Sequence, residues 1–117
     1  MSEIAIYHNP RCSKSRQTLA LLENHGVTPE VILYLETPPS AAELKNVLVK
    51  LGKSPRELIR KGEAEYKDNN LKDSSLSDAD LLAAMVKFPK LIERPIVIKG
   101  DKVKIGRPPE GVLELLS

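Results

Sequence analysis

The chain opens with a short apolar segment, Glu3-Ile4-Ala5-Ile6-Tyr7, which predicts a strand. Helical spacing begins at about Cys12, and Gly26 is placed to end the helix. A continuous apolar run at residues 31–35 then predicts a second strand that is covered on both faces. Strand, helix and strand in this order predict a βαβ unit with parallel strands.

The middle of the chain predicts helices. Capping boxes, in which a serine is followed three residues later by an acid, open predicted helices at residues 40–52 and 54–60. A third helix is expected to start at Ser77 and to stop at Phe88-Pro89. The polar residues 61–75 between them predict a loop or a frayed helical turn.

The period of the apolar positions drops to two near the C-terminus. Residues 95–98 and 102–105 flank Gly100-Asp101 and predict an antiparallel hairpin. Pro108-Pro109 is expected to open a last helix. The apolar face of that helix would carry Val112, Leu113 and Leu116.

These elements together predict an α/β fold. We expect a four-stranded mixed sheet flanked by helices, with a helical insertion at about residues 40–93. The 117 residues suffice for one domain, which we place at residues 1–117.

Composition and charge mainly exclude classes of partner and of cellular location. With 18 basic and 16 acidic residues the net charge is +2, which indicates no nucleic-acid or membrane partner. The start of the chain lacks a signal-peptide pattern, and no apolar run reaches membrane-spanning length. One cysteine cannot form an internal disulfide, so we expect a cytoplasmic protein. We also expect a monomer, because the sequence shows no heptad repeat or obvious apolar patch that argues against one.

The cysteine lies in the segment HNPRCSKSR, where the first strand passes into the first helix. The helix N-terminus, together with the basic residues around Cys12, favours the thiolate, which is the nucleophilic form. His8 could add positive charge if it is protonated, and the Ser15 hydroxyl could donate a hydrogen bond to the sulfur. The competing interpretation is a buried, inert thiol, with His8 a loop residue of no special role. We favour a reactive Cys12, because inert thiols have apolar neighbours.

Other chemistry is poorly supported by the sequence. One cysteine and two distant histidines supply no metal-ligand spacing, so we expect no metal. A glycine-rich phosphate loop is also missing from the sequence.

Three arginines stand near element ends. Arg60 ends a short helix, Arg94 precedes Pro95 at a strand start, and Arg107 follows a strand. The Arg94–Pro95 bond is a candidate cis peptide. Around a thiolate, several guanidiniums would bind a tetrahedral oxyanion, although each arginine could instead cap a helix or form a local salt bridge.

The motifs as a set resemble the glutaredoxin-dependent arsenate reductase family. The matching segments are YHNPRCSKSR, LYLETPPS, SPRELIRK, LIERPIVI and IGRPPE, which arrive in order over nearly the whole chain. The resemblance implies a thioredoxin-like fold, with Cys12 as the nucleophile and His8 and Ser15 keeping its thiol ionised. It also implies that Arg60, Arg94 and Arg107 bind arsenate or its adduct.

The resemblance further implies the reaction, which is reduction of arsenate to arsenite in arsenic detoxification. No cofactor is expected to be bound. Because the chain has no second cysteine to attack the Cys12 adduct, the reductant must come from outside. The resemblance identifies it as glutathione, a co-substrate, with glutaredoxin as the partner that regenerates the thiol.

Two other functions stay open. A glutathione-linked thiol protein that acts on another oxyanion or on mixed disulfides would use the same Cys12. A redox regulator that binds RNA polymerase would share the fold, but such proteins often carry a CxxC switch, and this chain has Cys12 and Ser15 at that spacing.

Overall fold

The computed structural model describes residues 4–116, which divide into two compact units. The sheet unit comprises the chain up to Thr37 and from Arg94 onward, and the helical unit is Pro38–Glu93. The predicted insertion at residues 40–93 therefore agrees with the helical unit to within two residues. The prediction of one domain over residues 1–117 stays a prediction.

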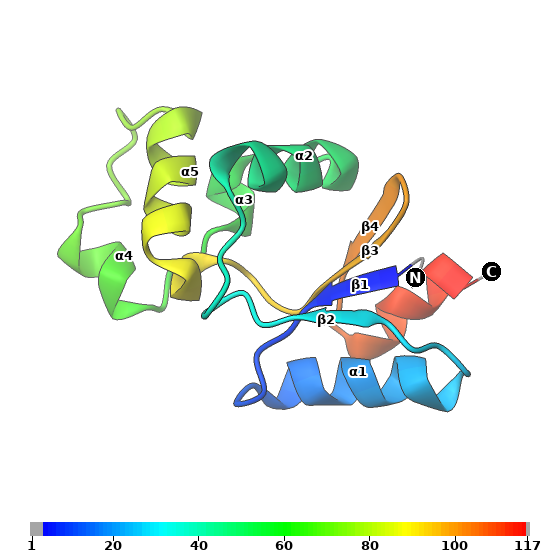
Figure 1. The fold of residues 1–117 in the computed structure, drawn as a ribbon. Coiled ribbons are helices and arrows are strands. Elements are labelled where there is room, and N and C mark those ends of the chain that lie inside the picture. Colours follow the sequence, from blue (N-terminus) through cyan, green and yellow to red (C-terminus); the bar gives the residue numbers. More distant parts are fainter. Residues whose placement is uncertain (1–3, 117) are drawn as a thin grey trace. The chain divides into compact units, whose positions relative to one another are not determined.

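The sheet unit contains a four-stranded mixed sheet in the order β2-β1-β3-β4 (Figure 1). Its strands are β1 (Ile4–Tyr7), β2 (Glu30–Ile32), β3 (Ile96–Lys99) and β4 (Lys102–Ile105). β1 pairs with β2 in parallel and with β3 antiparallel, and β3 pairs with β4 antiparallel. The predicted mixed sheet, the parallel first pair and the hairpin are confirmed.

Two helices of the sheet unit, α1 (Ser13–Asn24) and the 3₁₀ helix η2 (Pro109–Leu116), pack against each other. They share one apolar core with the sheet, because β1 places alternate residues on the same face. Six buried residues form this core: Ile4, Ile6, Leu22, Val97, Val112 and Leu115. The core holds β1 and α1 against each other, and the cysteine loop connects these two elements.

Two details of the sheet unit differ from prediction. The apolar run at 31–35 is a strand only to Ile32. The prediction that this strand is covered on both faces was wrong, because Val31 is 43% exposed. The last helix is a 3₁₀ helix, so its buried residues, Val112 and Leu115, are three apart instead of lying at 112, 113 and 116.

The helical unit contains α2 (Ala41–Leu51), α3 (Pro55–Leu58), α4 (Ala64–Asp68), α5 (Asp78–Lys87) and the 3₁₀ turn η1 (Pro89–Leu91). The capping boxes at Ser40 and Ser54 are confirmed, and Ser77 caps α5 in the same way. α3 ends two residues earlier than expected, and α4 is a single helical turn within the polar segment. A β-bridge between Ile59 and Ile92 joins the residue after α3 to the residue after η1.

Candidate active site

The loop between β1 and α1 presents Cys12 at the start of the helix. The Cys12 backbone N–H donates to Asn9 O (3.0 Å), and the Arg11 N–H donates to the Asn9 side-chain oxygen (3.0 Å). The Arg16 guanidinium closes the loop by donating to Pro10 O at 2.8 Å. Cys12 is the N-cap residue of α1 in extended conformation, so its sulfur sits at the positive end of the helix. No acidic residue stands in the first turn of α1 to compete for that end.

His8 and Ser15 hold the same loop from inside. His8 Nδ1 shares a hydrogen bond of 2.6 Å with Ser15 Oγ, which also accepts the Asn9 backbone N–H at 3.0 Å. Both side chains are buried. Within residues 4–116, neither forms a hydrogen bond to the Cys12 sulfur. Their contact with each other takes the place of the direct Ser15-to-sulfur bond considered above, and their role toward the thiol stays a prediction.

The charge state of His8 follows from its surroundings. Burial lowers the pKa of His8 below its ordinary value of 6.5, and the positive charge of Arg16 lowers it further, against a weaker opposing effect of Glu23. Both effects disfavour the charged imidazolium at this position. Positive charge at the thiol is better supplied by other groups.

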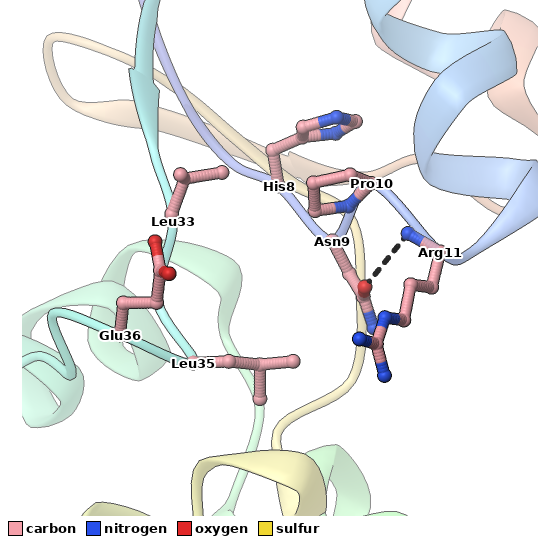
Figure 2. Close-up of a pocket in the computed structure, with 7 residues that line it drawn as sticks. All are labelled: His8, Asn9, Pro10, Arg11, Leu33, Leu35 and Glu36. Carbon is pink, nitrogen blue, oxygen red and sulfur yellow. Dashed lines mark hydrogen bonds between the residues drawn. The ribbon is translucent and has the colours of Figure 1, made fainter.

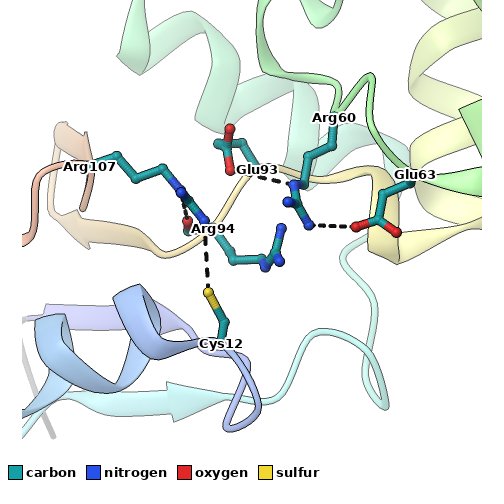
Figure 3. Close-up of polar contacts among 6 residues, drawn as sticks. All are labelled: Cys12, Arg60, Glu63, Glu93, Arg94 and Arg107. Carbon is teal, nitrogen blue, oxygen red and sulfur yellow. Dashed lines mark hydrogen bonds and ion pairs between the residues drawn. The ribbon is translucent and has the colours of Figure 1, made fainter.

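One such group is Arg107, which follows β4. Its Nη2 lies 3.8 Å from the Cys12 sulfur, and its Nε donates to the Arg94 carbonyl at 2.8 Å (Figure 3). The guanidinium is thus oriented by the backbone just before β3 while its other edge faces the sulfur. Arg94 itself is half-buried beside it. The structure therefore brings Cys12, Arg94 and Arg107 together from three separate segments of the sheet unit.

The backbone under these arginines is closely packed. The Arg94–Pro95 and Arg107–Pro108 bonds are both cis, and the first was the predicted candidate. Between them, the Gly106 N–H donates to Pro95 O at 2.9 Å, and a Cβ at Gly106 would lie 2.5 Å from Thr18 Oγ1. Sequence reasoning missed this contact of Gly106 with Thr18. The only sequence signal was a glycine directly before Arg107.

Arg60, the third predicted oxyanion ligand, belongs to the helical unit. Its Nη1 lies 2.6 Å from a Glu63 carboxylate oxygen, and its Nε lies 3.7 Å from Glu93 (Figure 3). These are the local salt bridges that were the alternative to anion binding. The two roles are compatible, because ion-paired arginines keep further N–H donors, and the role of Arg60 toward an oxyanion stays a prediction.

A cavity of about 310 Å³ lies beside the cysteine loop (Figure 2). The loop contributes four residues to it, and the chain after β2 contributes three. The lining residues are His8, Asn9, Pro10, Arg11, Leu33, Leu35 and Glu36. Sequence reasoning did not find this cavity, because its two walls are more than twenty residues apart in the chain.

Other kinds of site find little support in the residues that the structure describes. Residues 4–116 contain no group of three or more His, Cys, Asp or Glu side chains that could hold a metal ion. In the same range, no helix combines the length and the apolar character needed to cross a bilayer.

The fold and the site define a thioredoxin-like protein with a single cysteine at the N-terminus of its first helix and a guanidinium at the sulfur. The sequence model of the ArsC family matches residues 7–115, and the chain belongs to that family. The predicted family and fold class are confirmed.

Similar proteins cover almost the whole chain. An Escherichia coli K12 protein named uncharacterized protein YfgD is 60% identical over 116 residues, covering 98% of both chains. A Haemophilus influenzae protein named arsenate reductase is 54% identical over 114 residues, covering 97% of this chain and 98% of its own. The solved structure titled arsenate reductase from Vibrio cholerae is 58% identical, covers 95% of each chain and superposes with a TM-score of 0.93.

Proposed function

We propose that this protein is an arsenate reductase in which Cys12 is the nucleophile. The observation that carries the proposal is the 3.8 Å contact between the Cys12 sulfur and Arg107 Nη2 at the N-terminus of α1. The helix N-terminus and the Arg107 guanidinium place positive charge at the sulfur, where an anionic substrate can be received. The names of the relatives from Haemophilus influenzae and Vibrio cholerae support arsenate as that substrate.

The first step is attack by the Cys12 thiolate on arsenate. A sulfur–arsenic bond forms, and one arsenate oxygen leaves as water after protonation. Arg107 and Arg94 are the oxyanion ligands from the sheet unit, and Arg60 is the proposed third ligand. Their planar forks suit a tetrahedral oxyanion and stabilise the charge on the pentavalent adduct.

The second step needs an outside thiol, because the chain holds one cysteine. The glutathione thiolate attacks the Cys12 sulfur, so that a disulfide forms and the sulfur–arsenic electron pair stays on arsenic. Arsenic is thereby reduced from As(V) to As(III) and leaves as arsenite, while two thiols are oxidised to the mixed disulfide. Glutaredoxin then removes glutathione by thiol–disulfide exchange and restores the Cys12 thiol.

The test is arsenate-dependent NADPH consumption in the presence of glutathione, glutaredoxin and glutathione reductase. We expect turnover by the wild type and none by Cys12→Ser. Arg107→Lys keeps a positive charge but loses the fork, and we expect kcat/KM for arsenate to fall about 100-fold. The matched control is Arg56→Lys, because the Arg56 guanidinium donates to the carbonyls of Leu71 and Asp73 instead. We expect its activity to be retained.

A failed assay would also be informative. A wild type without arsenate turnover, whose Cys12 still reacts with iodoacetamide at about pH 6, contradicts arsenate as substrate. Ordinary thiols are almost fully protonated at that pH. That result would favour a glutathione-linked thiol protein that acts on another oxyanion or on mixed disulfides.

A further inference from the structure

The cavity beside the cysteine loop carries one cation and one anion. Arg11 and Glu36 line it from opposite sides, one on the loop after β1 and the other on the chain after β2 (Figure 2). Within residues 4–116, neither the Arg11 guanidinium nor the Glu36 carboxylate has a hydrogen-bond or ion-pair partner. The two opposite charges therefore face the same cavity without neutralising each other. Such an arrangement is complementary to a ligand that carries both charges.

The wall between the two charges is apolar. β2 ends at Ile32, and the Glu36 and Thr37 N–H groups both donate to Leu33 O at 2.9 Å, which turns the chain. Tyr34 is fully buried, whereas Leu33 and Leu35 on either side of it are 37% and 36% exposed and line the cavity. Exposed leucines at a concave site offer contact area for the methylene groups of a small ligand.

The cavity shares its loop with the reactive thiol. Arg11 directly precedes Cys12 in the chain, and the Cys12 N–H is bound to Asn9, which also lines the cavity. The volume of about 310 Å³ lies within the range of small-molecule sites, which begins at about 300 Å³. A ligand held here is next to the segment that presents the sulfur.

We propose that this cavity binds the outside thiol, as a zwitterionic peptide of the glutathione class. The carboxylate at its glycyl end pairs with Arg11, the ammonium at its glutamyl end pairs with Glu36, and its methylene groups lie against Leu33 and Leu35. This inference rests on the proposed function for the need of an outside thiol. It adds the residues that select that thiol by charge.

The experiment measures thiol exchange at Cys12 without arsenate. Cys12 is first converted with DTNB to its mixed disulfide with thionitrobenzoate. The attacking thiol loses its proton to solvent, forms a disulfide with the Cys12 sulfur and releases thionitrobenzoate, whose absorbance gives the rate. The quantity compared is the rate constant for glutathione divided by that for uncharged 2-mercaptoethanol. A general change in the reactivity of Cys12 alters both rate constants by the same factor and therefore cancels in this ratio.

We expect Arg11→Glu and Glu36→Lys each to lower this ratio about fivefold, as expected for partly exposed charges worth about 1 kcal/mol. The matched control is Lys14→Glu, which makes the same charge change as Arg11→Glu on an exposed residue that does not line the cavity. Its ratio should stay within about twofold of the wild type. Blocked ligands refine the test. Glutathione ethyl ester should be insensitive to Arg11→Glu, and N-acetylglutathione should be insensitive to Glu36→Lys.

Two results would overturn the inference. One is an unchanged ratio in both cavity variants, and the other is an equal fall in Lys14→Glu, which would indicate a general electrostatic field. Failure of the proposed function has a different signature. If the ratio depends on the cavity charges but arsenate is not turned over, then the glutathione site stands and arsenate as substrate is contradicted. If arsenate is turned over but the ratio does not depend on the cavity charges, then arsenate stands as substrate and the glutathione site is contradicted.

Discussion

The packing around Gly106 gives a strong test of how the arginines are positioned. In Gly106→Ala, the added Cβ would lie 2.5 Å from Thr18 Oγ1 and 2.7 Å from Pro95 Cγ. Ordinary contacts begin at 3.4 Å, so the backbone beside Arg107 or the helix that carries Thr18 must move by about 1 Å. Thr18 cannot easily turn away, because it is fully buried and its hydroxyl donates to Lys14 O at 2.8 Å.

Overpacking of this kind costs about 1–3 kcal/mol. For a chain of this size we expect the midpoint of thermal unfolding to fall by about 4–12 °C. The catalytic effect should be of similar size, because a displacement of about 1 Å at a positioning group can cost about 100-fold in rate, or about 2.7 kcal/mol. Urea unfolding and kcat/KM for arsenate measure the two effects separately.

Two control variants separate the effect of the close contact from the general effect of replacing glycine by alanine. A Cβ at Gly111 would meet only Ile105 O at 3.8 Å, so Gly111→Ala should leave the free energy of unfolding nearly unchanged. Adding Thr18→Ala to Gly106→Ala removes two of the three contacting atoms, and the double variant should recover part of the loss. If Gly106→Ala unfolds like Gly111→Ala and keeps full activity, then the inferred packing between α1 and the Arg107 segment is wrong.

Three further predictions concern stability. Ser77→Ala removes the capping box of α5 and should lower the free energy of unfolding in urea by about 1 kcal/mol, with exposed Ser74→Ala as control. Met85→Ala empties a fully buried position and should cost about 2–5 kcal/mol by the same measurement, whereas a cost near zero would contradict its burial. Because the pKa of His8 is lowered from 6.5, the unfolded chain binds the proton more tightly. The contribution of neutral His8 to the free energy of unfolding is therefore complete above about pH 6.5 and is lost as the pH falls below that value. His8→Gln should show a smaller loss of stability between about pH 8 and about pH 5, and an unchanged loss would contradict this.

Much of the fold could be predicted from local signals in the sequence. Serine caps followed by acids marked the starts of α2, α3 and α5, because a cap satisfies backbone N–H groups using residues within one turn. The hairpin around Gly100 was predictable for the same reason, since its turn and its two strands are contiguous. The position of Cys12 at a strand–helix junction also followed from the sequence alone.

Where the prediction failed, the deciding interaction was distant in the chain. Residues 31–35 have the composition of a buried strand, but β2 pairs only with β1 and ends at Ile32, after which Tyr34 is buried and Leu33 and Leu35 are exposed. The last helix has an apolar pattern that suits α-helical spacing, and its packing against α1 and β4 accompanies a 3₁₀ form. Neither neighbour is visible in a local window.

The sequence by itself determined most of the secondary structure, the family and the place of the single cysteine at a strand–helix junction, because these depend on short-range spacing and residue type. Only the tertiary structure decided which groups meet that thiol. Arg107 reaches the sulfur from ninety-five residues away, burial lowers the pKa of His8, and Arg11 faces Glu36 across a cavity. Distances between distant residues and the burial of a charge arise from packing, which no local pattern encodes.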